Sequence, residues 1–228
     1  MIFIGDLVTF YESGITGDGF FSIFAVMKRI LLSVCILFAA IPTAFADDGG
    51  AWLSLQANKG WEKAYAFARL EHRSNNKFGS TEALFTSVGG GYKFTPWLKA
   101  DLSYEFWDIN PDLNFHKAVL CGTGTLAKDG LSVSLREKLE FAVNPANSAT
   151  SFTLRTRLRA QYNIPDSIFR PYVMSEIFTW KSWIRSLHYA GAELAIDRHN
   201  CVDLFYMYHL PNGSQAVHLI GVGYYFSF

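Results

Sequence analysis

The stretch that decides the fold runs from Ser151 to Ile164 and reads SFTLRTRLRAQYNI. Its alternate positions differ in polarity. One face carries Phe152, Leu154, Leu158, Ala160 and Tyr162, and the other carries Thr153, Arg155, Arg157, Arg159 and Gln161. Because successive side chains of a β-strand point to opposite faces, this period of two predicts a strand with one apolar and one cationic face.

The same alternation recurs along the chain and predicts ten strands. They are Trp61–Arg73, Thr81–Phe94, Trp97–Ile109, Phe115–Leu126, Leu131–Val143, Ser151–Ile164, Phe169–Trp180, Ile184–Ile196, Cys201–Leu210 and Gln215–Phe228. These segments contain 10 to 14 residues. A tilted strand needs roughly 9 to 11 residues to cross a bilayer, whereas strands of soluble sheets average roughly five or six.

Two all-β architectures fit this pattern. A soluble secreted β-sandwich would pack the apolar faces together, and a transmembrane β-barrel would turn them to lipid. Aromatic side chains gather at segment ends, as at Trp97, Trp107 and Trp180, where the girdle of a membrane barrel would lie. We therefore predict an antiparallel transmembrane β-barrel over residues 61–228, with the sandwich as the alternative.

The number of strands is predicted from parity. Trp52–Gln56 is a possible eleventh strand, but bacterial single-chain barrels have an even number and keep both chain ends in the periplasm. Ten strands are therefore predicted, with twelve as the runner-up, and residues 47–60 are expected to form a periplasmic segment before the barrel.

The amino-terminal part has the pattern of a secretory signal peptide. Lys28 and Arg29 precede an apolar run from Ile30, and Ala44-Phe45-Ala46 is a small-x-small cleavage site. The run is short and interrupted for a spanning helix. Residues 1–26 contain three acidic and no basic side chains. We therefore expect translation to start at Met27 and a signal peptide over residues 27–46.

Composition excludes several classes of function. The 228 residues carry 20 basic and 20 acidic side chains, which argues against a nucleic-acid partner. There is no phosphate loop, dinucleotide fingerprint or clustered metal-ligand pattern, and no cofactor or metal is expected. After cleavage only Cys121 and Cys201 would remain, and their spacing fits a disulfide or two apolar fillers equally well.

In a barrel, the charged faces of these strands would line the lumen. The predicted lumen cluster consists of Lys99, Asp101, Glu105, Arg136, Lys138, Glu140, Arg155, Arg157, Arg159, Glu176, Arg185 and Glu193. The basic members could form a cationic passage that favours anions. Alternatively, the acids could neutralise them, because a narrow lumen hydrates charges poorly. Ten strands lie barely above the eight that side chains can fill, which favours a plugged interior over an open pore.

An enzyme is the alternative function. His72 lies beside Glu71 and Arg73 at a strand end, and a carboxylate beside an imidazole is a minimal general base for an outer-membrane hydrolase. No serine stands at a recognisable spacing from this pair. We predict that the protein is not an enzyme.

The carboxyl end resembles the final-strand signal of Gram-negative outer-membrane proteins. Gly223 is followed by alternating aromatic residues that include Phe226, and the sequence closes on Phe228. The resemblance implies an outer-membrane location, lipid as the surrounding partner, and recognition of the last strand by the barrel-assembly machinery.

Several motifs follow one another in a distinctive order: Leu154–Arg159, Arg170–Tyr172 with Glu176–Phe178, Gly191–Leu194, Asp203–Tyr208 and the closing aromatic strand. Through them the sequence from about Trp52 to Phe228 resembles DUF2490, an uncharacterised family found mainly in Bacteroidetes. The family has no defined function. The overall expectation is therefore an outer-membrane barrel that is structural or a narrow conduit or binding site for a small solute.

Overall fold

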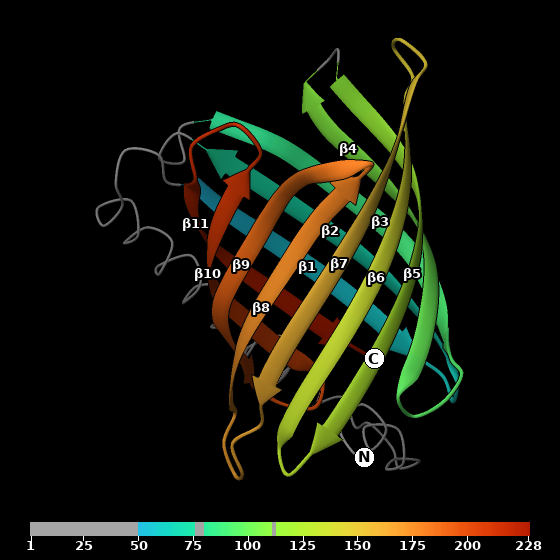
Figure 1. Cartoon of the computed structure of the whole chain (residues 1–228). Helices are drawn as coiled ribbons and strands as arrows, with labels where there is room; N and C mark the ends of the chain where they lie inside the picture. The colour runs from blue at the N-terminus through green and yellow to red at the C-terminus, as the bar shows by residue number, and fades with distance from the viewer. Residues whose placement is uncertain (1–49, 76–79, 111–112) are drawn as a thin grey trace, which may run out of the picture.

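The alternating segments form a closed barrel of eleven strands in the computed structural model, which describes residues 50–75, 80–110 and 113–228 (Figure 1). The strands are β1 Gly50–Gly60, β2 Ala64–Asn75, β3 Ser80–Lys93, β4 Leu98–Asn110, β5 Leu113–Lys128, β6 Leu131–Asn144, β7 Ala149–Tyr162, β8 Phe169–Trp180, β9 Ser182–Ala195, β10 Asn200–Pro211 and β11 Val217–Ser227. The proposed start at Met27, the signal peptide over 27–46 and its cleavage after Ala46 lie outside the described residues.

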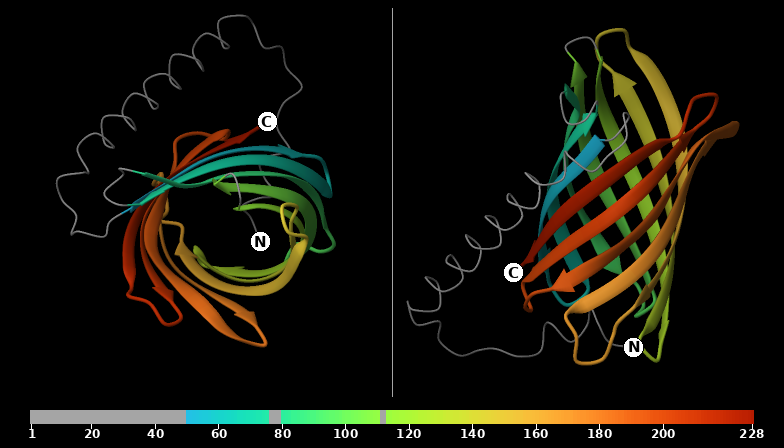
Figure 2. Two further views of the ribbon diagram at one scale, coloured as in Figure 1. Left: turned by 90° about the horizontal axis from the view of Figure 1, so that it is seen from above. Right: turned by 90° about the vertical axis from the view of Figure 1, so that its left-hand side faces the viewer.

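Each strand pairs with its neighbours in sequence, antiparallel from β1 through β11, and β1 then pairs with β11 in parallel. Viewed along the barrel, the strands surround one interior (Figure 2). The prediction of an all-β barrel is confirmed, and the sandwich alternative is wrong because a single sheet closes on itself. In the described part of the chain, no helix is long and apolar enough to cross a membrane.

The exclusion of Trp52–Gln56 as a strand was wrong. These residues belong to β1, which pairs from Gly50 opposite Leu219 to Asn58 opposite Ser227. With an odd number of strands the first and last run in the same direction, so they close the ring with a parallel ladder, which the parity argument had not allowed. Residues from Gly50 onward are thus part of the barrel rather than a segment before it, and the described strands number neither ten nor twelve.

This parallel closure also places the two ends of the described barrel apart. Gly50 lies beside the start of β11, whereas Phe228 follows the end of β11. We refer to the rims as the Gly50 end and the Phe228 end. The expectation that both ends of the barrel strands lie on the same side was therefore also wrong.

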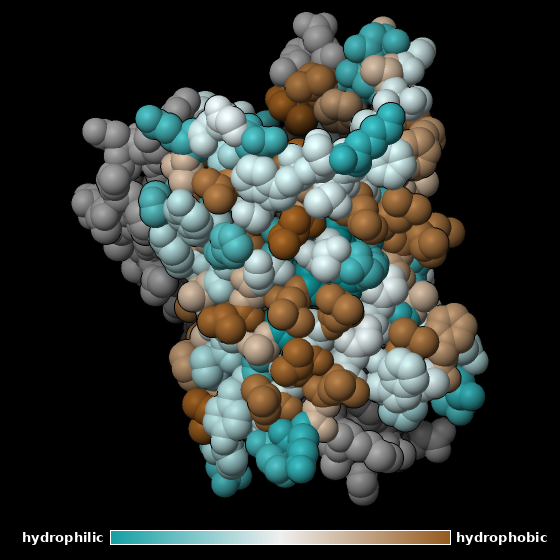
Figure 3. Space-filling view, viewed as in Figure 1, coloured by the Kyte–Doolittle hydropathy of each residue, from teal (hydrophilic) through white to brown (hydrophobic). Residues whose placement is uncertain are grey.

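The apolar faces point outward, as the alternation predicts for a membrane barrel. Leu102 and Leu158 are 65% and 53% exposed, while the side chain of Arg155 is only 11% exposed in the interior. In Figure 3 apolar side chains occupy much of the middle of the face over β5–β8, and hydrophilic ones gather toward its two ends. The core of this molecule is thus the polar face of its strands.

The interior has an aromatic side and a charged side. On β8–β11 a buried cluster fills the lumen; it contains Tyr172, Phe178, Leu187, Tyr189, Met207 and Leu219, and Trp52 packs against it. Phe205 also packs there, opposite Gly221, where an added Cβ would approach its ring to 1.9 Å. Glycine at 221 therefore lets the aromatic side fit inside the ring.

Candidate functional site

The strand register turns all twelve residues of the predicted lumen cluster toward the interior. They are Lys99, Asp101, Glu105, Arg136, Lys138, Glu140, Arg155, Arg157, Arg159, Glu176, Arg185 and Glu193. Most of them stand on β4–β8. Because each strand alternates strictly through this region, the charges of neighbouring strands meet on one wall of the lumen.

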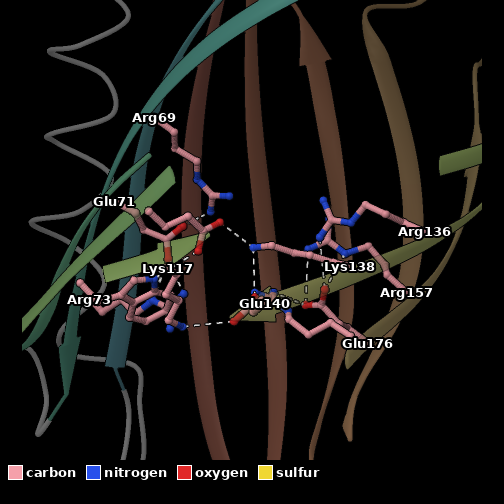
Figure 4. Close-up of polar contacts among 12 residues, drawn as sticks. Arg69, Glu71, Arg73, Lys117, Arg136, Lys138, Glu140, Arg157 and Glu176 are labelled. Carbon is pink, nitrogen blue, oxygen red and sulfur yellow. Dashed lines mark hydrogen bonds and ion pairs between the residues drawn. The ribbon is translucent and has the colours of Figure 1, made fainter. Parts of the chain in front are cut away.

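Glu176 is the centre of this wall. Its side chain is fully buried and accepts hydrogen bonds from three guanidinium groups: Arg155 Nη2 at 2.9 Å, Arg136 Nη2 at 3.2 Å and Arg157 Nε at 3.2 Å. A carboxylate enclosed in this way is stable as an anion only because its charge is matched by the arginines. Figure 4 shows Glu176 of β8 together with Arg136 and Arg157, which stand on the neighbouring strands β6 and β7.

Two cations connect Glu176 to the other carboxylates. Arg155 Nη1 lies 2.6 Å from Glu140 Oε1, so Arg155 joins Glu140 and Glu176. Lys138 Nζ lies 3.1 Å from Glu140 and 2.6 Å from Glu105. Together with Lys117, which lies 3.2 Å from Glu140, these residues form one ion-pair network from β4 to β8.

A second charged cluster stands on β2 and includes Glu71, which was predicted to form a general base with His72. Glu71 is 1% exposed and is bound by Arg69 and by Arg73, whose Nη2 lies 2.6 Å from Oε1. His72 points to the outer face, where Nε2 lies 3.2 Å from Thr81 Oγ1. Glu71 and His72 therefore do not form the proposed base. The alternation of Arg69, Glu71 and Arg73 is the signal that identifies them as lumen residues.

Near the Phe228 end the pairs are smaller. Arg159 Nη2 lies 2.7 Å from Glu193, and Gln161 donates to the same carboxylate at 2.8 Å. Tyr172 donates to Asp203 at 2.9 Å, a contact that no sequence pattern indicated. Each of these carboxylates is satisfied within the interior.

Aromatic faces support several of the cations. The guanidinium of Arg73 lies 3.7 Å from the ring centroid of Trp52, and that of Arg155 lies 4.4 Å from Phe178. Arg185 also stacks on Phe178, at 4.2 Å. Among the described residues, Arg185 has no carboxylate within 4.0 Å, which distinguishes it from the arginines of the network.

The charged and aromatic sides together fill the middle of the barrel. Glu176 and Met207 are fully buried, although they stand on strands that surround the lumen. A cavity of about 200 Å³ lies near the Gly50 end and is lined by Arg73, Arg155, Arg185 and their aromatic neighbours. A packed centre thus adjoins a cavity toward one rim.

The residues of the predicted assembly signal lie on and directly after β11. The Phe226 ring stacks on that of Phe228 with centroids 5.8 Å apart, and Gly223 faces the interior opposite Ser54. Phe228 also reaches β1: its backbone N–H donates to Asn58 at 3.1 Å, and Lys59 lies 5.1 Å from its ring centroid. Phe228 therefore contacts both sides of the closure.

The described residues contain no cluster suited to a metal ion, and Cys121 and Cys201 are both free thiols. Each cysteine points into the lumen, on β5 and β10 respectively. The cysteines therefore act as interior side chains in this structure.

Comparison with solved structures supports the fold. The NanC porin superposes with a TM-score of 0.52 over 77% of this chain and 96% of its own, at 13% sequence identity. No curated protein matches the sequence. The sequence model of the family described as "Protein of unknown function (DUF2490)" matches residues 49–217, from the residue before β1 to the first residue of β11. The motifs noted above and this match over most of the barrel agree, and the chain belongs to the DUF2490 family.

Proposed function

We propose that this protein is an integral barrel of a Gram-negative outer membrane whose interior is closed at its centre and binds a small solute. The observation that carries the membrane assignment is the direction of the side chains. Leucines such as Leu102 and Leu158 cover the outer face, while Arg155 and its partners are enclosed. In water, such a surface would be an unusually large exposed apolar area.

A bilayer removes this difficulty. The closed ring satisfies the backbone hydrogen bonds of the strands without an open edge, which is the condition for β-structure in hydrocarbon. The outer leucines then contact lipid, and Trp61, Trp97, Trp180 and Trp183 lie at the strand ends, where aromatic side chains anchor barrels. Lipid is therefore the main partner, and β11 with Phe228 is the segment offered to the barrel-assembly machinery.

The packed centre argues against a wide pore. Eleven strands are few enough for side chains to fill much of the lumen, and the ion-pair network occupies it from β4 to β8. An enzymatic role has little support, because Glu71 and His72 face opposite sides of β2. We therefore assign no catalytic residue.

Cell fractionation combined with bilayer recordings tests the proposal. The protein should fractionate with outer membranes, require detergent for extraction and migrate faster on gels before heating than after. Purified protein in planar bilayers should show no steady conductance like that of an open porin. A chain that stays soluble without detergent would refute the membrane assignment, and a large constant conductance would refute the closed centre.

A further inference from the structure

Several side chains that line the cavity near the Gly50 end have polar atoms without a hydrogen-bond partner in the described part of the chain. It measures about 200 Å³ and is bounded by Trp52, Trp107, Phe178 and three arginines, with His209 and Glu82 also in its wall. These residues come from eight strands, β1–β4 and β7–β10. All of them except Arg155, which stands at the middle of β7, lie near the strand ends at this rim. Glu82 is exposed, so this wall reaches the surface.

The charge of the lining is positive. Three guanidinium groups, those of Arg73, Arg155 and Arg185, face one lining carboxylate, that of Glu82. Arg73 and Arg155 are already bound to buried carboxylates of the interior, whereas Arg185 has no such partner among the described residues. The cavity therefore contains one arginine whose charge nothing in the described interior neutralises directly.

Four buried nitrogen atoms of the lining lack a hydrogen-bond partner: Trp52 Nε1, Arg155 Nε, Arg185 Nε and His209 Nε2. The first three can only donate. Leaving a buried donor unpaired is costly, and most buried polar groups of folded proteins have a partner. Among the described residues, four of the six buried side-chain nitrogens without a partner line this cavity, and the other two are the Nε atoms of Arg136 and Arg159. An acceptor with several lone pairs would satisfy them together.

The arginines are also held in place. The guanidinium groups of Arg155 and Arg185 lie 4.4 Å and 4.2 Å from the ring centroid of Phe178. The guanidinium of Arg73 stacks on Trp52. Stacking of this kind fixes the plane of a guanidinium while leaving its N–H edge available for a planar or tetrahedral oxyanion.

We infer that this cavity is a binding site for a small solute that carries an oxyanion, either a carboxylate or a phosphate, with Arg185 as its principal ligand. The volume is below the roughly 300–1,000 Å³ typical of sites for drug-sized molecules, which limits the solute to a small one. The direction from which the solute enters rests on the proposed function. If the barrel-assembly machinery receives β11 and Phe228 on the periplasmic side, the cavity at the opposite rim faces the outside of the cell.

Titration of the intact barrel in detergent tests the inference, with Trp52 and Trp107 as fluorescent reporters in the cavity wall. Sodium acetate and sodium phosphate are the two probes, added at constant ionic strength, and acetamide is the neutral match for acetate. We expect a saturable change in fluorescence with at least one anion and none with acetamide. The arm that responds more strongly distinguishes a carboxylate ligand from a phosphate ligand.

The variants isolate the role of Arg185. Arg185→Gln should weaken binding at least about tenfold, because it removes the charge-assisted hydrogen bonds that the guanidinium would donate to the oxyanion. Arg185→Lys keeps the charge without the planar fork and should give an intermediate affinity. The matched control is Arg170→Gln, another lumen-facing arginine that does not line the cavity, and it should bind as the wild type does.

Gel migration before and after heating shows whether each protein is a folded barrel. A folded wild type with no saturable response, or unchanged binding in folded Arg185→Gln, would overturn the inference while the membrane barrel stands. Saturable binding by a chain that never enters membranes would refute the proposed function and leave the site intact.

Discussion

Lys138 Nζ lies 2.6 Å from Glu105 Oε1 although their strands, β6 and β4, are separated by β5. The contact therefore passes over the inner face of β5. On that face Lys117 of β5 forms an ion pair with Glu140 of β6. Trp107 Nε1 donates to the second oxygen of Glu105 at 3.3 Å. Interior side chains thus connect strands that share no backbone hydrogen bonds, and these contacts stabilise the barrel across its lumen.

The Lys138–Glu105 pair should behave as a coupled unit. Lys138→Gln or Glu105→Gln alone leaves an uncompensated charge in the interior and should lower the free energy of unfolding by about 3–5 kcal/mol. The double variant should lose less than the sum of the two, by about 0.5–3 kcal/mol. Urea unfolding in lipid vesicles measures the cycle. Strict additivity would show that the two groups do not interact.

Neutralising Glu176 should be the most disruptive change to a single carboxylate. Glu176→Gln removes the charge that holds Arg136, Arg155 and Arg157, leaving their positive charges close together. We expect a loss of about 3–5 kcal/mol in unfolding free energy. The control is Glu62→Gln in an exposed turn, which should change stability by less than about 0.5 kcal/mol. Equal effects of the two variants would contradict the central role of Glu176.

The outer face should tolerate charge only near its rims. Leu120, which is exposed near the middle of β5, is expected to lie at the centre of the bilayer. Leu120→Lys should cost about 2–4 kcal/mol, whereas Leu126→Lys, on the same face near the strand end, should cost about 0–1 kcal/mol. Refolding into vesicles across a urea series compares them. If both changes are equally mild, the leucines do not face hydrocarbon.

Deletion of Phe228 should reduce the amount of assembled barrel in cells. It removes the aromatic residue that follows β11, its hydrogen bond to Asn58 and its contact with Lys59. Phe228→Tyr keeps the ring and the backbone and should assemble as the wild type does. The fraction of heat-modifiable protein in outer membranes reports the result, and full assembly of the deletion variant would count against the signal.

The eleventh strand can be tested by cysteine crosslinking. In a Cys121→Ala/Cys201→Ala background, Leu53→Cys with Val222→Cys places two thiols opposite each other on the outer face of the β1–β11 pair. Oxidation should join them efficiently. Leu53→Cys with Phe226→Cys is offset by four residues, about 13 Å along the strand, and should stay reduced. Efficient crosslinking of the offset pair alone would show a different register.

Local patterns predicted most of this structure because they depend on properties that each strand carries by itself. The alternation around Arg157 sets both its strand and its inward direction. Whether Trp52 and its neighbours form a strand depends on how the barrel closes, because β1 pairs with the distant β11. No local pattern contains that information, and the general rule of an even strand number excluded this strand wrongly. The cavity is less predictable still, since Arg185, Trp52 and His209 stand on different strands and meet only once the barrel has closed.

The parallel pairing of β1 with β11 has a mechanical consequence. All the other ladders of the described barrel can grow from hairpins between neighbours, but β1 and β11 must find each other across nearly the whole length of the described chain. Contacts so distant in sequence form slowly, and parallel ladders are slightly weaker per residue than antiparallel ones. The β1–β11 pair is therefore expected to form last during folding and to separate first when the barrel is under mechanical load. Phe228 contacts Asn58 and Lys59 of β1 from the end of β11, so it fastens this pair at one rim.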